Sequence, residues 1–409
     1  MMRPRSALLS LSAFVVLVYP VMLWQKKRLF SSTPVMDGVT AWFWIAEPLA
    51  LALLFYAASA RIRQKILCYV CVVAASFFLA CATAEIYFRF LHVEPGKLVL
   101  QSHDSVYVKS GQATHLEEID GSAPDPVLGY GPNRSGKKMR FAARRVAGDE
   151  VIYDVLYSRD EEGRRITPDR GDKADTAILL FGCSYTFGMC LNDQETYAWQ
   201  LGEMLGERFQ VFNYGFPGYG SHQMLALIES GRLDTLVRRY KHIYASFLTI
   251  TDHPVRCITN RPFQSGPHYI LENGAIKYVG AFSHTVDRLF AHSQVYKQVK
   301  LPYYKRLQSD RACNTHVAII VQAMRELKTR YNAHALTVIW PDFPHIAPML
   351  RNNGVRTLLL TGVMPDYASV PEKYAVNKSD GHPNALANTR VAEALAEYFL
   401  KHPQAAGEQ

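Results

Sequence analysis

Three long apolar runs at the start of the chain constrain its fold more than any other feature. They cover residues 7–24, 41–60 and 66–84, and each is close to the length of a helix that spans a bilayer. Basic residues follow the first two runs, as is typical of membrane flanks. We therefore predict a membrane anchor of three transmembrane helices over residues 1–92, followed by a globular part large enough for a full core.

Charge leaves the orientation of this anchor nearly undecided. With the N-terminus in the cytoplasm, the bases on that side are Arg3, Arg5, Arg61, Arg63 and Lys65, and those outside are Lys26, Lys27, Arg28, Arg89 and Lys97. The two groups are equal in size, so the positive-inside rule gives no clear choice. No small-residue cleavage pattern follows the first run, which favours an uncleaved anchor over a signal peptide.

The net charge and the cysteines limit the partners that we expect. The net charge is +9, but the bases are scattered or lie beside apolar runs, without the pattern of a nucleic-acid module. We therefore expect the lipid bilayer as a partner and no nucleic acid. The four cysteines of the globular part form no CxxC pair, so we expect no zinc site. Cys257 and Cys313 bracket a long insertion and are either bridged or two unrelated thiols.

A polar, turn-rich segment follows the anchor over residues 93–170. Residues 125–138 have the composition of turns, and residues 140–146 and 151–160 have that of strands. We predict a β-rich linker or small lobe here, and none of its residues has evident chemistry.

From residue 176 onward, short apolar runs alternate with helical patterns. This alternation predicts an α/β fold, a three-layer αβα sandwich in which helices cover both faces of a parallel sheet. The predicted domain covers residues 171–409 with an insertion at 252–312, and its active site should lie beyond the carboxyl ends of the strands. The expected strands are 176–182, 209–215, 242–250, 334–340 and 356–360, and the expected helices are 193–206, 221–240, 315–331 and 383–400.

The first two strands end in segments that suit nucleophilic chemistry. Ser184 follows the first strand and precedes a helix, whose free amide donors can stabilise an oxyanion. A serine at this position can also simply cap the helix. Thr186 replaces the last glycine of GxSxG, which disfavours an α/β-hydrolase elbow. The second strand leads into a glycine-rich segment, residues 213–220, which either approaches a ligand closely or forms an ordinary turn.

A third segment, Asp380-Gly381-His382-Pro383, precedes the last expected helix. Pro383 suits the first position of that helix, which would place His382 at its positive end as a neutral base. Asp380 is close enough in sequence to orient the imidazole, although such a pair can also cap a surface helix. All three segments are expected at one edge of the sheet. There they would supply the base and the hydrogen-bond donors that a serine requires to attack an ester.

These segments resemble the sequence blocks of the SGNH, or GDSL-like, hydrolases. GCSYTFG resembles the first block, with Ser184 as the nucleophile, and NYGFPGYG resembles the second, with the oxyanion glycine at Gly218. DGHPN resembles the last block, with Asp380 and His382. The resemblance covers about residues 176–400 and implies an SGNH/flavodoxin-like fold and a Ser-His-Asp mechanism. It also implies that the backbone amides of Ser184 and Gly218 hold the oxyanion.

The chain departs from the family pattern beside the nucleophile and after the third strand. Cys183 stands where the family usually has an aspartate. The family's third block carries an asparagine as a second oxyanion donor, whereas the matching segment here is Thr251-Asp252-His253. Either His253 replaces that asparagine or the oxyanion site is weaker.

The spacing of the acid and the base also differs from that of many family members. Asp380 lies two residues before His382, where many members have three. A rival pair with the longer spacing, Asp342 and His345, follows the fourth strand but does not open the last helix.

The resemblance implies a serine ester hydrolase, an O-acyl or acetyl esterase that acts on cell-envelope carbohydrate or lipid. One alternative is an O-acyltransferase that modifies a glycan with the same residues. Another is a non-catalytic binding or assembly protein on the same scaffold. We expect no cofactor and no metal, an acylated glycan or lipid as the substrate, and a multi-pass protein of the bacterial inner membrane with its catalytic domain outside the cytoplasm.

Overall fold

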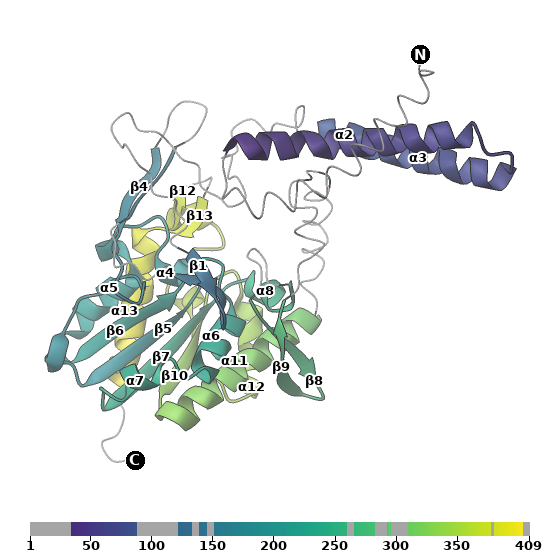
Figure 1. Cartoon of the computed structure of the whole chain (residues 1–409). Coiled ribbons are helices and arrows are strands. Elements are labelled where there is room, and N and C mark those ends of the chain that lie inside the picture. The colour runs from purple at the N-terminus through teal and green to yellow at the C-terminus, as the bar shows by residue number, and fades with distance from the viewer. Residues whose placement is uncertain are drawn as a thin grey trace. The chain divides into compact units, whose positions relative to one another are not determined.

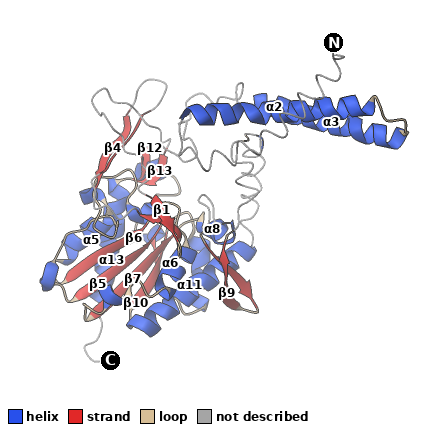
Figure 2. Ribbon diagram, viewed as in Figure 1, coloured by secondary structure: helices blue, strands red, loops and turns tan. Residues whose placement is uncertain are grey.

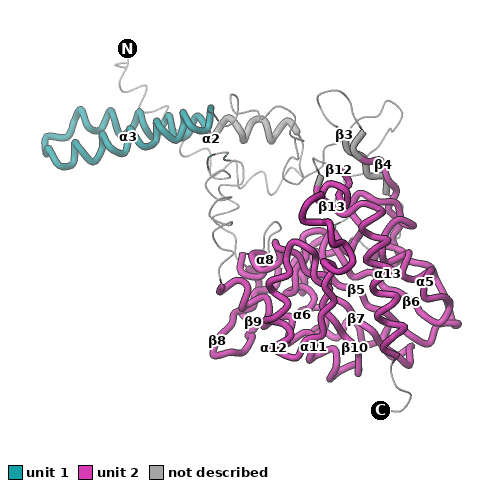
Figure 3. The backbone as a smooth tube through the Cα atoms, turned by 180° about the vertical axis from the view of Figure 1, so that it is seen from behind, with its two compact units in different colours: residues 1–95, 284–306 teal, residues 96–283, 307–409 magenta. Residues whose placement is uncertain are grey.

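A computed structural model of the chain describes residues 34–87, 122–132, 139–144, 151–259, 266–282, 293, 295, 310–377 and 380–403 (Figure 1). The chain divides into two compact units. The first comprises residues 1–95 and 284–306, and the second comprises residues 96–283 and 307–409 (Figure 3).

The first unit contains two helices, α2 (Pro34–Ser59) and α3 (Lys65–Ile86), which lie side by side and are joined by a short turn (Figure 2). Phe55 stacks on Phe78 across the pair, with ring centroids 5.8 Å apart. Among the described residues, only α3 is both long and apolar enough to cross a membrane, and Ile45–Ser59 is a shorter apolar helical stretch. The first predicted run, residues 7–24, lies outside the described part of the chain.

A buried carboxylate lies near the end of α3. The Glu85 side chain accepts hydrogen bonds from the Ser293 hydroxyl and from the backbone N–H of Val295, both at 3.0 Å. Glu85 itself is only 2% exposed. These two bonds supply the partners that a buried polar group needs, and they attach residues of the insertion to α3.

The second unit is built on a five-stranded sheet in which all neighbouring strands are parallel. In order of occurrence along the chain, the strands lie in the order 2-1-3-4-5, which is the flavodoxin-like arrangement. The predicted α/β class with a parallel sheet is therefore confirmed. The strands are β5 (Thr176–Gly182), β6 (Phe209–Gly215), β7 (His242–Thr249), β10 (His334–Ile339) and β11 (Thr357–Leu359).

Helices cover both faces of this sheet (Figure 2). In the fully buried strand β5, Ile178 and Leu180 face one apolar cluster while Leu179 and Phe181 face the other. This two-sided burial is what a continuous apolar run in a parallel sheet requires. The helices of one face are α5 (Tyr197–Leu205) and α13 (Ala385–Lys401), and those of the other include α6 (Ser221–Glu229) and α11 (Asp310–Tyr331).

The segments expected to form one long helix and a run of turns differ from the observed elements. The single helix expected over residues 221–240 is interrupted, because Gly231 takes a left-handed conformation with φ of 72° between α6 and α7 (Asp234–Val237). Part of the stretch expected to form turns is instead a hairpin of β1 (Ser122–Asp125) and β2 (Gly129–Pro132). The Asp125 carboxylate closes its turn by accepting hydrogen bonds from the next N–H groups at 2.8 and 2.9 Å.

Smaller elements complete the second unit. The two strands expected in the linker are present as an antiparallel pair. The insertion contains a short helix and a second hairpin among its described residues. These elements are β3 (Met139–Arg144), β4 (Val151–Tyr157), α8 (His253–Thr259), β8 (Pro267–Glu272), β9 (Ala275–Ala281) and α12 (Ala347–Asn352).

A buried arginine fixes the loop that follows Ser184 and its short helix. Arg165 is fully buried, and its Nε donates to the Asp193 carboxylate at 2.7 Å. Its other nitrogens donate to the carbonyls of Gly188 and Leu191 at 2.9 and 2.6 Å. The guanidinium also lies 4.1 Å from the centre of the Tyr157 ring. One side chain therefore satisfies several buried acceptors of this loop.

We expect Arg165→Met to lower the free energy of unfolding by about 3–5 kcal/mol, because it leaves the Asp193 charge buried without its partner. Denaturant unfolding of the full-length chain in detergent would measure this change. The matched control is Arg390→Met, which removes an exposed pair with Glu393 and should change stability by less than about 0.5 kcal/mol. Equal effects of the two substitutions would contradict this view of Arg165.

Candidate active site

Ser184 lies at the carboxyl edge of the sheet, where the strand order reverses. It lies one residue beyond the end of β5, which has β6 on one side and β7 on the other, and it is the first residue of α4 (Ser184–Phe187). Parallel sheets bind ligands at such a reversal point. Ser184 is 6% exposed, so its hydroxyl lies in a nearly enclosed position.

Two glycines allow α4 to pack directly on the backbone of the strands. A Cβ atom on Gly182 would lie 2.1 Å from the Thr186 hydroxyl, and one on Gly215 would lie 2.6 Å from the Phe187 nitrogen. The buried Asn213 amide also donates to the Thr186 carbonyl at 2.9 Å. Only glycine fits at these two positions, and the position of Ser184 follows from this close approach.

The structure brings Ser184 and His382 together, as the sequence predicts. The Nε2 atom of His382 lies 2.9 Å from the Ser184 hydroxyl oxygen, which is hydrogen-bonding distance. Tyr185 supports this arrangement, because its hydroxyl donates to the Gly381 carbonyl at 3.2 Å and its ring lies 5.7 Å from the imidazole. Trp340 packs behind Tyr185, with ring centroids 5.0 Å apart. Tyr185 was not predicted from the sequence, because an aromatic residue beside a serine gives no distinctive pattern.

The start of the last helix was predicted two residues too early. The helix α13 begins at Ala385, and Asn384 caps it by accepting from the N–H of Ala387 at 3.0 Å. Asn384 also donates to the carbonyls of Lys373 and Ala375, which joins the start of the helix to an earlier segment of the chain. Pro383 therefore ends the strand β13 (Asp380–Pro383), which pairs with β12 (Ala375–Asn377), and His382 lies in this strand rather than at the first turn of the helix.

The acid of the predicted triad remains a prediction. The backbone of Asp380 pairs with Asn377 in the strand that carries His382, but its side chain lies outside the described part of the structure. The rival pair, Asp342 and His345, is exposed, and the His345 ring packs 4.8 Å from that of Phe343. The base that the structure places beside Ser184 is therefore His382.

The predicted oxyanion donor Gly218 lies in a tight turn. The N–H of Tyr219 donates to the Phe216 carbonyl at 3.1 Å, which makes Pro217 and Gly218 the central residues. Gly218 has φ of 80°, so the turn is of type II. Among the described residues, no acceptor pairs with the Gly218 N–H, which leaves this donor available to a ligand.

The predicted second donor, His253, is fully buried among core side chains. Its ring lies 5.3 Å from Phe247 and 5.9 Å from His316. Burial, followed by the charge of nearby Arg256, holds the pKa of His253 well below its ordinary value of 6.5. Nδ1 accepts from the N–H of Ile250 at 3.4 Å, and Nε2 has no partner in the described part of the chain. His253 is thus a neutral ring with an unused N–H, and its role at the oxyanion stays a prediction.

Cys183, which replaces the family's aspartate, is completely enclosed. It has no exposed surface, and the charged Arg256 side chain lies near it. Arg256 also donates to the Tyr219 carbonyl at 2.9 Å and pairs with Asp252 at 3.4 Å. The enclosed thiol is not exposed to a substrate, whereas Arg256 links the segments that follow β6 and β7.

A buried polar network lies beneath the glycine-rich segment. The two ring nitrogens of His316 lie 2.8 Å from the hydroxyls of Ser221 and Thr249. The Cys257 sulfur lies 3.1 Å from the Ser221 hydroxyl, and both Cys257 and Cys313 are free thiols rather than a disulfide. Burial lowers the pKa of His316 to about 3. Among the described residues, no cluster of three or more histidine, cysteine or acidic side chains is arranged to hold a metal ion.

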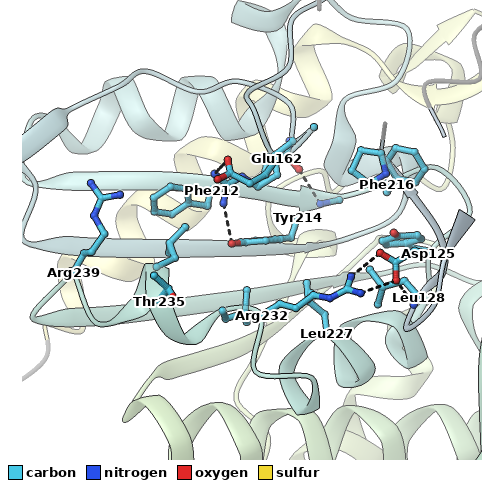
Figure 4. Close-up of a pocket in the computed structure, with 18 residues that line it drawn as sticks. Asp125, Leu128, Glu162, Phe212, Tyr214, Phe216, Leu227, Arg232, Thr235 and Arg239 are labelled. Carbon is cyan, nitrogen blue, oxygen red and sulfur yellow. Dashed lines mark hydrogen bonds and ion pairs between the residues drawn. The ribbon is translucent and has the colours of Figure 1, made fainter. Parts of the chain in front are cut away.

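A cavity of about 380 Å³ opens beside the edge strand β6 (Figure 4). Its lining includes Phe216 and Tyr219 from the Gly218 turn, but neither Ser184 nor His382. The cavity and the Ser184–His382 pair therefore share the turn without being one site.

No family model and no curated protein matches the chain. Among solved structures, it is similar to a lipolytic protein of the G-D-S-L family from Veillonella parvula, with 11% identity over 56% of this chain and 100% of that one, and a TM-score of 0.33. A carbohydrate acetylesterase from Sinorhizobium meliloti has 9% identity over 55% of this chain and 99% of its own, with a TM-score of 0.30. An aryl esterase from M. smegmatis has 12% identity over 55% and 99%, with a TM-score of 0.29.

The buried network predicts a dependence of stability on pH. The pKa of His316 is about 3 in the folded protein and near 6.5 in the unfolded chain. The contribution of neutral His316 to the free energy of unfolding is therefore fully present above about pH 6.5. We expect that contribution to be lost at about 1.4 kcal/mol per pH unit as the pH falls from 6.5 toward 3. Unfolding free energies of the wild type and His316→Gln, measured between pH 7 and 4, would test this. The wild type should show the steeper decline, and parallel curves would refute the assignment.

Proposed function

We propose that this protein is a membrane-anchored serine ester hydrolase of the SGNH type that acts on acylated carbohydrate or lipid of the cell envelope. The observation that carries the proposal is the 2.9 Å contact between the Ser184 hydroxyl and His382 Nε2 at the carboxyl edge of the sheet. A serine hydroxyl is a weak nucleophile until an adjacent base accepts its proton, and this contact supplies that base.

The proposed reaction follows from these positions. The Ser184 oxygen attacks the acyl carbonyl while His382 Nε2 takes the hydroxyl proton, and Asp380 orients the imidazole. The N–H groups of Ser184 and Gly218 hold the oxyanion, with His253 as a further donor. Collapse of the intermediate passes the proton from His382 to the leaving alcohol. Water then attacks the acyl-enzyme with His382 as the base, which releases the carboxylic acid and restores Ser184.

The free amides at the site support an enzyme over a binding scaffold. Ser184 is the first residue of its helix, so its N–H has no acceptor within the helix. The Gly218 N–H likewise has no acceptor in the described part of the chain. Polar groups of a folded protein normally have partners, so donors left open beside a paired serine and histidine favour a developing negative charge as their ligand.

Membrane attachment is supported by the surface of α3. Its apolar side chains are exposed, including Ile66 at 79%, Val73 at 69% and Phe77 at 62%. An apolar helix that is left uncovered by protein is expected to be covered by lipid. An anchored esterase meets substrates of the envelope, which is why we propose that substrate class.

An active-serine probe would test this function. We expect a fluorophosphonate to label the full-length protein in detergent, and the protein to hydrolyse p-nitrophenyl acetate. Ser184→Ala should abolish the labelling, and Ser184→Ala or His382→Ala should lower kcat by about 10³-fold or more. The control Ser230→Ala changes an exposed serine and should behave as the wild type.

Two results would count against the hydrolase. A folded wild type that is not labelled would favour a binding or assembly protein on this scaffold. Acyl transfer to an added glycan in place of release of free acid would assign the same residues to a transferase.

A further inference from the structure

The hairpin β1–β2 is tied to the Gly218 turn by a reciprocal pair of hydrogen bonds. The Tyr130 hydroxyl donates to the Pro217 carbonyl at 3.0 Å, and the Tyr219 hydroxyl donates to the Tyr130 carbonyl at 2.8 Å. The two rings pack edge to face with centroids 5.3 Å apart, and both side chains are buried. The hairpin thus makes a direct polar contact with the middle peptide of the turn.

That middle peptide carries the proposed oxyanion donor. A trans peptide is planar, so its C=O and its N–H point in opposite directions. The peptide that carries the Pro217 carbonyl also carries the Gly218 N–H. Type I and type II turns differ mainly in a flip of this middle peptide. A hydrogen bond that holds the Pro217 carbonyl toward Tyr130 therefore holds the Gly218 N–H pointing the opposite way.

The hairpin β1–β2 is itself held in place by an ion pair. Two nitrogens of Arg232 donate to the Asp125 carboxylate at 2.6 and 3.1 Å (Figure 4). The pKa of Asp125 lies below its ordinary value. Burial raises this pKa, but the hydrogen bonds to Arg232 and to backbone N–H groups together lower it by more. A planar two-point contact of this kind restricts orientation as well as distance. On the other side of the turn, Arg256 donates to the Tyr219 carbonyl at 2.9 Å. The carbonyls of Pro217 and Tyr219, which flank Gly218, therefore both have side-chain partners.

We propose that Tyr130 is a positioning residue of the active site, which aims the Gly218 N–H at the oxyanion by holding the Pro217 carbonyl. This inference rests on the proposed function. It gives a role to the hairpin β1–β2, whose sequence shows no catalytic motif, and it explains why the turn keeps the type II form without any partner for Gly218 among the described residues.

The experiment compares Tyr130→Phe with Tyr219→Phe in the full-length protein. Each substitution removes one hydroxyl and one hydrogen bond between the hairpin and the turn, but only Tyr130→Phe releases the Pro217 carbonyl. We expect kcat of Tyr130→Phe on p-nitrophenyl acetate to fall at least about tenfold with little change in KM. The reason is that the Gly218 N–H would no longer point at the oxyanion, which forms only in the transition state. Tyr219→Phe should remain within about twofold of the wild type, and both should lose similar thermal stability.

The outcomes separate this inference from the proposed function. If the wild type is neither labelled by a fluorophosphonate nor active on esters, both fail together. If the wild type is active and Tyr130→Phe keeps its kcat, only the role of Tyr130 is refuted. If the two variants lose kcat equally, in proportion to their loss of stability, the hydroxyl of Tyr130 is structural and the inference is also wrong.

Discussion

The proposed chemistry depends on one hydrogen bond, between the Ser184 hydroxyl and His382 Nε2, which joins positions 198 residues apart. No local structure can hold so distant a pair together, so the whole sheet must do it. Strand β5 places the serine at the carboxyl edge, and α13 packs against the same face as α5, which brings the segment just before α13 to that edge. Tyr185 completes the arrangement by binding the Gly381 carbonyl beside the imidazole.

Rigid surroundings make such a contact useful, because a reacting group must be held to within a fraction of an ångström. Here the rigidity comes from close backbone packing and from buried polar side chains that bind carbonyl groups. Gly182 and Gly215 let α4 rest on the strands without an intervening side chain. Arg165 binds the loop after the serine helix, and Tyr130 binds the turn that carries Gly218. Arg165 is a buried donor with several acceptors, and Tyr130 is a buried donor to the Pro217 carbonyl. Loss of either side chain would leave buried carbonyl groups without a hydrogen bond, which is costly.

The first unit shows that the insertion is more than a surface loop. Ser293 and Val295 belong to it, yet both bind Glu85, 208 and 210 residues earlier in the chain. The division into compact units agrees with these contacts, because residues 284–306 belong to the same unit as the N-terminal helices. The chain therefore passes between the two units three times, after residues 95, 283 and 306. A carboxylate near the end of an apolar helix is costly to bury without partners, and the insertion supplies them.

The sequence by itself determined the strands of the sheet, its parallel character and the positions of Ser184, Gly218 and His382 in segments at its carboxyl edge. These features are local: an apolar run that ends in glycine, or a serine between a strand and a helix, can be recognised within a few residues. Tertiary structure alone decided that Asn384 rather than Pro383 sets the start of the last helix, and that Cys257 bonds Ser221 instead of Cys313. It also revealed Tyr130, Arg165 and His316, which are common residue types in unremarkable surroundings. Most of their hydrogen-bond partners lie between 22 and 95 residues away, and no periodicity or motif encodes a contact between such distant positions.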